Sequence, residues 1–321
     1  PQAHDIIRTW LFSTVVRSHA EHDSLPWKHT AISGWILDPN RQKMSKSKGN
    51  VVTPMALLEQ YGTDAVRYWA LSARLGADTA FDEKQMRIGR RLAIKVLNAS
   101  RFVLSFTSRL AEAGDVDLRD TQNVTVAVDR ALLAGLAHVI DEATAAYEDY
   151  NFSKALNVTE TFFWTFCDDY LELVKDRAYG GPDCGASQED ITSARITLTI
   201  ALDSALRLLA PFIPFATEEV WSWWREGSIH TSSWPVAQHL PTDGDAAVIE
   251  AAGEALAALR KKKSEAKVSQ RTPFGNVTLH TPHADALGPV VNDLVRAGVI
   301  EGDFDLAKGE EVVVSGELRT S

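Results

Sequence analysis

The hydrophobic pattern is helical almost without interruption from about Asp82 to Trp224, and this stretch limits the fold more than any other part of the chain. Its breaks are short and rich in turn residues. They separate predicted helices at 83–110, 123–150, 152–178 and 188–225, with turns at Gly114-Asp115, Tyr150-Asn151 and Tyr179-Gly180-Gly181-Pro182. Long helices joined by short turns pack as antiparallel neighbours. We therefore predict a mainly α protein built on an antiparallel helical bundle.

The first predicted helix has two distinct faces. One is an apolar stripe of Ile88, Leu92, Val96, Ala99 and Val103, and the neighbouring face carries Arg87, Arg91, Lys95, Asn98 and Phe102. A positive strip that ends in an aromatic ring suits single-stranded RNA, because charges follow the backbone and a ring stacks on an unpaired base. A solvated charged face with Phe102 in the core fits the same residues equally well. The spacing alone leaves both interpretations open.

A different pattern precedes the helices. Thr30–Leu37 is predicted to be a buried parallel strand, and the loop Lys43-Met44-Ser45-Lys46-Ser47-Lys48-Gly49-Asn50 follows it. Thr53 and Pro54 then begin a helix, Gly62 ends it, and Thr63 is expected to cap the next one. In open α/β sheets, such strand-to-helix corners hold phosphate-bearing ligands. The three lysines would bring mobile positive charge to those phosphates.

The loop and its flanks resemble the class I aminoacyl-tRNA synthetases. Lys43–Asn50 is similar to the second signature of that class, the KMSKS loop, and Val51–Arg67 is similar to its valyl, isoleucyl and leucyl branch. Within the branch, Phe81–Met86 and Asn98–Phe102 most resemble the valyl-tRNA synthetase family. The resemblance implies the end of a class I Rossmann-type catalytic domain at residues 1–80, an anticodon-binding bundle at 81–228 and a small α/β domain at 229–321.

The resemblance also implies the chemistry of the loop. In this family the amino-acid carboxylate attacks the α-phosphorus of ATP, and ammonium groups stabilise the charge that develops on the phosphates. Lys46 is assigned to the reacting phosphates and Lys43 to the departing pyrophosphate, and both are expected to be catalytic. The ATP-binding residues would be Gly34, Trp35, Ile36, Lys43, Met44, Ser45, Lys46 and Ser47. Mg²⁺ is expected to accompany the ATP. Lys48 fits a phosphate contact and a solvated side chain equally well.

Two further sites are implied by the resemblance. The predicted helix Ala3–Val16 carries Asp5, Ile6 and Trp10. Spacing alone places Ile6 and Trp10 in a core, whereas the family pattern makes them the apolar wall of an amino-acid pocket, with Asp5 near the substrate ammonium. The family also places anticodon-loop contacts on the first bundle helix, which favours the RNA interpretation of its positive strip.

The chain after the bundle is predicted to be a small α/β domain. An extended connector at 228–235 leads to a helix at Ala246–Val268, strands at Val277–His280, Gly298–Ile300 and Glu311–Val314, and a helix at Asp285–Ala297. The basic segment Arg260–Arg271 fits a solvated helix end and a functional surface equally well.

Composition narrows the function. Lys and Arg number 33 against 43 Asp and Glu, for a net charge of −10, which argues against binding nucleic acid through bulk charge but not through a local strip. Cys167 and Cys184 are the two cysteines, and no metal-binding string accompanies them, so we expect a reducing compartment and no protein-bound metal. Asp168, Asp169 and Glu172 are interpreted as a helix surface. Without a signal peptide or membrane span, we expect a cytoplasmic protein. We also expect a monomer.

We interpret the chain as part of a valyl-tRNA synthetase that joins L-valine to tRNA(Val) with ATP. It begins at Pro1 inside a predicted helix and contains neither the His-x-Gly-His signature nor an editing domain or coiled-coil arm. We therefore expect the carboxyl-terminal part of a longer polypeptide, inactive alone. The alternatives are an isoleucyl- or leucyl-tRNA synthetase, a tRNA-binding module without catalysis, and a small-molecule nucleotidyltransferase. The last has no need of a long helical bundle.

Overall fold

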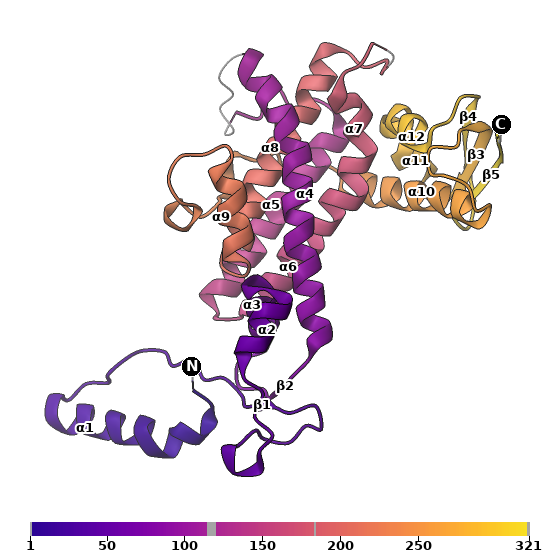
Figure 1. The fold of residues 1–321 in the computed structure, drawn as a ribbon. Helices are drawn as coiled ribbons and strands as arrows, with labels where there is room; N and C mark the ends of the chain where they lie inside the picture. The colour runs from indigo at the N-terminus through magenta and orange to yellow at the C-terminus, as the bar shows by residue number, and fades with distance from the viewer. Residues whose placement is uncertain (1, 114–119, 183, 320–321) are drawn as a thin grey trace. The chain divides into compact units, whose positions relative to one another are not determined.

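The structure, a computed structural model, describes residues 2–113, 120–182 and 184–319, and these are mainly helical (Figure 1). The prediction of a mainly α protein is confirmed. Contacts divide the chain into two compact units. The first consists of Pro1–Leu97, Glu142–Val158 and Leu209–Ser232, and the second of Asn98–Asp141, Thr159–Leu208 and Ser233–Ser321. The turn predicted at Gly114-Asp115 lies outside the described residues.

The first helix begins later than predicted. The segment forms a 3₁₀ turn, a π turn and the helix α1, at His4–Ile6, Ile7–Leu11 and Phe12–His22. Hydroxyl groups explain the irregular start, since Thr9 donates to the Ile6 carbonyl and Ser13 and Thr14 both donate to the Trp10 carbonyl. Such bonds compete with the regular helical ladder. The helix predicted over Ala3–Val16 is therefore displaced toward the carboxyl end.

The strand predicted over Thr30–Leu37 is wrong for most of its length. β1 (Ile36–Leu37) pairs in parallel with β2 (Thr79–Ala80) and contains only two residues. Ile36 is 44% exposed, so β1 is not a buried strand. The ladder stops at Trp35 because its backbone N–H donates to the Asp78 carboxylate, at 2.8 Å, and not to a backbone carbonyl of a neighbouring strand.

Two short helices enclose the core of the first unit. α2 (Pro54–Tyr61) has Thr53 at its N-cap position, as predicted, although the threonine side chain does not bond to the helix. α3 (Thr63–Leu71) begins directly after Gly62, whose φ of 89° suits glycine. Gly62, rather than Thr63, therefore occupies the cap position. The core between these helices contains Leu57, Tyr61, Ala65, Trp69 and Met86, with Val66 and Phe81 packed against it.

Hydrogen bonds join the carboxyl-terminal part of the first unit to α3. The helix predicted at 188–225 is divided into α8 (Gln188–Leu209) and α9 (Pro214–Ser222). This division was expected from Pro211 and Pro214, because proline interrupts a helix. The Asp64 carboxylate accepts the backbone N–H groups of Phe215 and Ala216 at 3.1 and 2.8 Å, and so caps the first turn of α9. Arg67 donates to the Pro211 carbonyl at 2.9 Å.

Helices from four parts of the sequence meet in the second unit. They are α4 (Glu83–Ala113), α5 (Ala127–Glu148), α7 (Leu171–Tyr179) and α8, and α7 continues α6 (Phe152–Trp164) through a π turn at Thr165–Tyr170. The Thr107 and Thr199 hydroxyls, 2.8 Å apart, join α4 to α8. The Phe106 and Tyr179 rings, 5.0 Å apart, join α4 to α7. Of the aromatic side chains predicted to be buried around residue 166, Phe162, Phe163, Phe166 and Tyr170 are buried, whereas Trp164 is only partly buried.

A small α/β layer completes the second unit. β3 (Phe274–Thr281) lies between β4 (Phe304–Lys308), which is parallel to it, and β5 (Val313–Leu318), which is antiparallel. Its helices are α10 (Ala246–Glu265), α11 (Ala284–Leu287) and α12 (Val291–Gly298). The Asp245 side chain caps α10 by accepting the Ala247 N–H at 2.9 Å.

Three predictions for the region after the bundle are wrong. The connector contains a 3₁₀ turn at Ile229–Thr231. The helix predicted at Asp285–Ala297 is interrupted by a second 3₁₀ turn, which contains Pro289. Gly298 ends α12, and Ile300 makes only a single bridge to Phe274, so no strand forms there and β4 takes its place in the sheet.

Candidate nucleotide and RNA sites

The lysine-bearing loop is folded around a short turn. Lys46–Lys48 form a single 3₁₀ turn, and the Ser45 hydroxyl caps it by accepting the Lys48 N–H at 3.3 Å. Gly49 ends the turn with φ 67°, in the left-handed region that glycine adopts without strain. The side chains of Lys46, Ser47 and Lys48 are exposed, whereas Met44 is half-buried. The loop therefore presents its ammonium groups to solvent from a defined backbone.

Asp38 and Asn50 hold the two ends of this loop together. The Asn50 amide donates to Asp38 Oδ2 at 2.9 Å, and its Oδ1 accepts the Ser45 N–H at 2.9 Å. The other Asp38 oxygen accepts the backbone N–H groups of Asn40 and Gln42. These bonds, the Asn50 bond first, lower the pKa of Asp38, which is only 7% exposed. The sequence around Asp38 does not reveal this role, because its side-chain partner Asn50 lies twelve residues away.

Lys43 lies against residues from two other segments. Its Nζ is 3.9 Å from the centre of the Trp35 ring and 3.9 Å from Asp5 Oδ2. The Trp35 indole N–H donates to Asp5 Oδ1 at 3.5 Å, and the His4 ring packs on Trp35 at 4.2 Å. The structure thus brings together three predicted site residues. Asp5 was predicted for the amino-acid pocket, Trp35 for the adenine side and Lys43 for the pyrophosphate side.

Close backbone packing supports this cluster. A Cβ atom on Gly34 would lie 2.0 Å from the Ala77 carbonyl oxygen, so only glycine fits at this position. Gly34 therefore lets the segment before Trp35 lie directly on the chain that leads to β2. Ile36, the third residue predicted for the adenine side, lies in β1.

The predicted apolar wall is not assembled in the described structure. Ile6 is half-buried, but Trp10 is 58% exposed and stacks on Trp27, with ring centres 5.6 Å apart. The assignment of Ile6 and Trp10 to an amino-acid pocket stays a prediction.

The positive strip lies along α4 as the spacing predicts. Leu92, Val96, Ala99 and Val103 are buried, while Arg87, Arg91 and Asn98 are exposed and Lys95 is partly exposed. Arg87 pairs with Glu83 one turn before it, at 3.3 Å. Phe102 is half-buried and packs edge-on against Phe106 and Tyr179, with ring centres 4.9 and 5.7 Å apart. Phe102 is therefore neither fully in the core nor free in solvent.

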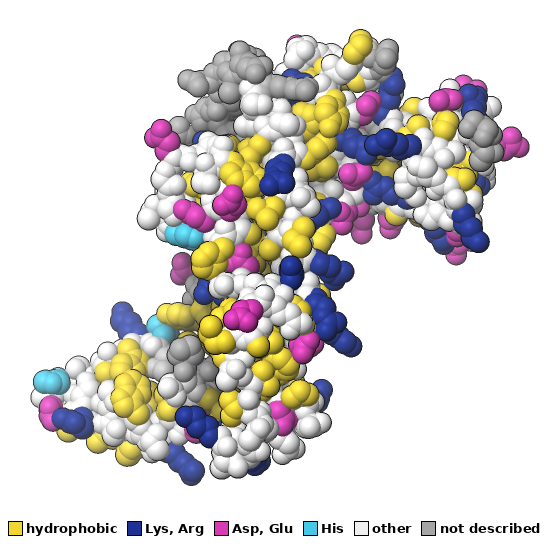
Figure 2. All heavy atoms as spheres, viewed as in Figure 1, with side chains coloured by type: hydrophobic (Ala, Val, Ile, Leu, Met, Phe, Trp, Pro, Cys, Tyr) yellow, Lys and Arg dark blue, Asp and Glu magenta, His cyan; other side chains and the backbone are white. Residues whose placement is uncertain are grey.

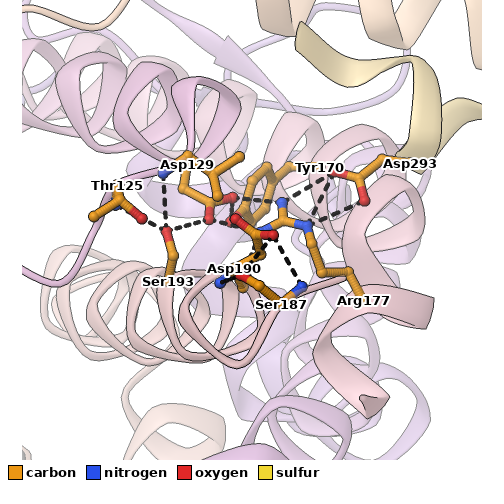
Figure 3. A network of polar contacts seen from close by, with 9 residues as sticks. Thr125, Asp129, Tyr170, Arg177, Ser187, Asp190, Ser193 and Asp293 are labelled. Atoms are coloured by element: carbon orange, nitrogen blue, oxygen red, sulfur yellow. Dashed lines mark hydrogen bonds and ion pairs between the residues drawn. The ribbon is translucent and has the colours of Figure 1, made fainter. Parts of the chain in front are cut away.

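A buried ion network joins α5, α7, α8 and α12 (Figure 3). Arg177, 6% exposed, donates to both oxygens of Asp129 at 2.8 Å and, through Nε, to both oxygens of Asp293 at 3.1 Å. Tyr170 and Ser193 donate their hydroxyls to Asp129 at 2.7 and 2.6 Å. Burial lowers the pKa of Arg177, but its two carboxylate partners outweigh that effect and raise it.

Two kinds of site receive no support among the described residues. No group of three or more His, Cys, Asp or Glu side chains in 2–113, 120–182 and 184–319 could hold a metal ion. The carboxylate cluster near residue 170 is a surface, in which Glu172 pairs with Lys175 and Arg260. Within the same described ranges, no helix is long and apolar enough to cross a membrane.

Comparisons with known proteins identify two domains. The family profile described as "tRNA synthetases class I (I, L, M and V)" matches residues 2–82, which contain the loop and the Asp5–Trp35–Lys43 cluster. The profile described as "Anticodon-binding domain of tRNA ligase" matches residues 129–279. The LeuRS chain of a ternary LeuRS–tRNA–LeuAMS complex from Agrobacterium radiobacter K84 shares the fold over 73% of this chain and 28% of its own length, with a TM-score of 0.51 and 21% sequence identity.

Sequence relatives extend over nearly the whole chain. A valine–tRNA ligase of Thermobifida fusca is 56% identical over 99% of this chain and 35% of its own length. Those of Salinispora tropica and Cutibacterium acnes are 51% and 50% identical over 97% and 99% of this chain, and over 37% and 36% of their own lengths. The chain thus spans about a third of the length of these relatives. On this identity and on the two domains, the chain belongs to the valine–tRNA ligase family.

Proposed function

We propose that a protein carrying this chain activates L-valine with ATP and transfers it to tRNA(Val). In this proposal residues 1–80 supply the phosphate loop of the catalytic domain, 81–228 the antiparallel anticodon-binding bundle and 229–321 the small α/β domain. The two unlinked cysteines suit a cytoplasmic setting, and a monomer is the state we expect there. No relative described above is named for isoleucine, so the isoleucyl alternative is not favoured.

The cluster of Asp5, Trp35 and Lys43 carries the proposal. Asp5, which lies 30 residues before Trp35, places its carboxylate within 4 Å of the Trp35 indole ring and of the Lys43 ammonium, which also lies within 4 Å of that ring. These groups suit the substrate ammonium, the adenine ring and the departing pyrophosphate. Gly34, Trp35 and Ile36 would line the adenine side, and Ile6 and Trp10 would complete the amino-acid pocket.

The loop would act by stabilising charge. Lys46 would contact the reacting phosphates, and Lys43 would leave the Trp35 ring to follow the pyrophosphate. Met44, Ser45 and Ser47 would hold the loop backbone against the triphosphate. A fixed ammonium helps the reaction where negative charge grows between ground state and transition state. Mg²⁺ would arrive with the ATP, held mainly by phosphate oxygens and water.

The bundle would bind the anticodon loop. Arg87, Arg91, Lys95 and Asn98 would follow its backbone, and the exposed edge of Phe102 would stack on an unpaired base. This assignment is supported by the exposure of the strip and by the match to an anticodon-binding domain that begins at residue 129, in the helix that follows α4.

The activity is tested in a chimera. This chain replaces the matching third of the Thermobifida fusca relative, with which it shares 56% identity. We expect valine-dependent ATP–pyrophosphate exchange close to that of the parent, and exchange with isoleucine about 10–200-fold slower, because an apolar wall rejects an added methylene by that factor. Exchange that is absent in the chimera but present in the parent, or that prefers isoleucine, would count against the proposal.

A further inference from the structure

A small pocket in the second unit has a charged lining that is almost entirely cationic. It has a volume of about 220 Å³ and lies where α7, α10, α12 and the segment after α10 meet. Figure 2 shows Lys and Arg side chains gathered between α7 and α12. Its charged lining consists of one carboxylate, Glu172, and five cations, Lys175, Arg260, Lys263, Arg271 and Arg296. Such a concentration is unexpected in a chain with a net charge of −10.

Lys263 is the buried member of this lining. It is 2% exposed, and its Nζ donates to the carbonyls of Gln270 at 2.9 Å and Gly298 at 2.7 Å, and lies 4.9 Å from the centre of the Phe274 ring. An ammonium has three protons, so one remains after these two bonds. Among the described residues no carboxylate lies within 4.0 Å of it, and burial lowers its pKa. The interpretation of Arg260–Arg271 as a solvated helix end is therefore wrong at Lys263.

The single carboxylate does not neutralise the pocket. Glu172 Oε2 is shared by Arg260 at 2.7 Å and Lys175 at 3.0 Å. Arg271 and Arg296, both exposed, have no carboxylate partner within 4.0 Å in the described part of the chain. A bound anion would supply the missing negative charge to these guanidinium groups and to Lys263.

The pocket is held in shape from two sides. The Gln270 side chain donates to the Ser264 hydroxyl at 3.0 Å and to the Arg260 carbonyl at 3.3 Å, and so fixes the segment that carries Arg271. Asp293, one turn before Arg296, is fixed by both of its bonds to Arg177. A site whose donors are already in place loses little conformational entropy when a ligand binds.

We propose that this pocket binds a phosphate group, with Arg271 and Arg296 as its outer contacts and Lys263 at its base. Guanidinium forks match phosphate oxygens, and several cations together favour a multiply charged anion over a carboxylate. The volume is below the roughly 300–1,000 Å³ of whole-ligand pockets, so the phosphate itself enters and not a complete nucleotide. The group can come from an RNA backbone or from a free phosphate ion.

The test uses this chain and two pairs of substitutions. Arg271→Gln with Arg296→Gln removes both outer contacts without disturbing the buried lysine. Lys308→Gln with Arg319→Gln is the matched control, because these exposed cations pair with Asp285 and Glu301 and are not part of the pocket lining. Inorganic phosphate is titrated against chloride at constant ionic strength, and backbone amide NMR shifts are followed. Binding of tRNA(Val) is measured across a salt series in parallel.

For the wild type and the control pair we expect phosphate to shift the amides of residues 263–271 and 296–299. The pocket pair, Arg271→Gln with Arg296→Gln, should weaken phosphate binding at least about tenfold, because each lost contact is a hydrogen bond to a charged group. If the source is RNA, the pocket pair should also reduce the slope of log K against log salt by about 1–2. If the pocket pair loses phosphate binding but keeps the salt slope of tRNA binding, the result supports the same site with the free phosphate ion as its ligand.

The proposal is overturned if phosphate shifts no amide of the pocket and the pocket pair binds tRNA like the control. The RNA arm rests on the proposed tRNA binding, but the phosphate arm needs no RNA. Phosphate binding without any tRNA binding would therefore support the pocket while counting against the proposed function, so the two ideas fail separately.

Discussion

Arg177→Met is expected to lower the free energy of unfolding of this chain by about 3–5 kcal/mol. Arg177 is the only cation among the described residues that pairs with Asp129, and it also holds Asp293. Methionine fills similar space but supplies neither charge nor donors. Asp129, whose side chain is completely buried, would keep only the Tyr170 and Ser193 hydroxyls as partners. The stranded charges, rather than the lost attraction, account for the size of the effect.

Urea unfolding of the chain measures this loss, and Arg260→Met is the matched control. Arg260 pairs with Glu172 at 2.7 Å, but both side chains are about a third exposed, so its loss should cost no more than about 1 kcal/mol. Adding Asp293→Asn to Arg177→Met should recover stability, because it removes one of the two stranded carboxylates. Equal losses for the two methionine variants would show that the network is no more than a surface ion pair.

Lys46→Ala is expected to reduce valine-dependent ATP–pyrophosphate exchange by about 10²–10³-fold in the chimera, mainly through kcat. Removing one preorganised donor to a developing oxyanion costs that factor in other enzymes. Lys46 is exposed at the start of the 3₁₀ turn, and the Asp38–Asn50 pair holds the loop that presents it. The alanine should leave the fold unchanged, because the Lys46 side chain makes no hydrogen bond or ion pair within the described chain.

Lys48→Ala is the control for charge alone. It lies two residues away, is equally exposed and carries the same charge. If Lys46 stabilises the transition state specifically, Lys48→Ala should change exchange by less than about tenfold. Equal losses for the two alanines would mean that the loop acts only through its total positive charge.

Periodicity predicted the helices because it is a local property. The stripe at Leu92 and Val96 and the positive face beside it could be read from a spacing of three or four residues, and both lie where expected. The π turn at Thr165–Tyr170 was missed because one extra residue hardly alters that spacing. The same reasoning explains why the division of the predicted last helix at its prolines could be foreseen.

Strands and long-range pairs could not be predicted in the same way. An apolar run such as Thr30–Leu37 becomes a strand only where a neighbour accepts its ladder, and β2 offers two residues. Arg177 binds carboxylates 48 and 116 residues away, and Asp38 binds an amide twelve residues away. The pattern around Lys263 fitted a solvated helix end and a functional surface equally well, although its ammonium is buried against Gln270, Gly298 and Phe274. In each case the deciding partner comes from another part of the chain.

Within the candidate site, the loop residues were predicted by resemblance and their mutual contacts were not. The motif around Lys43 indicated phosphate chemistry, but its approach to Trp35 and Asp5 depends on the close packing at Gly34. The roles assigned to Ile6 and Trp10 stay predictions.

We propose that this chain recognises tRNA(Val) through the bundle. The most direct measurement is binding of the chain to a tRNA(Val) transcript across a salt series, beside tRNA(Ile) and a tRNA(Val) with an exchanged anticodon. We predict a steep fall of affinity with salt, weaker binding of both comparison RNAs, and loss of binding in Arg87→Glu with Arg91→Glu but not in Lys308→Glu with Arg319→Glu. Binding that ignores the anticodon, or that survives reversal of the α4 strip, would contradict the claim.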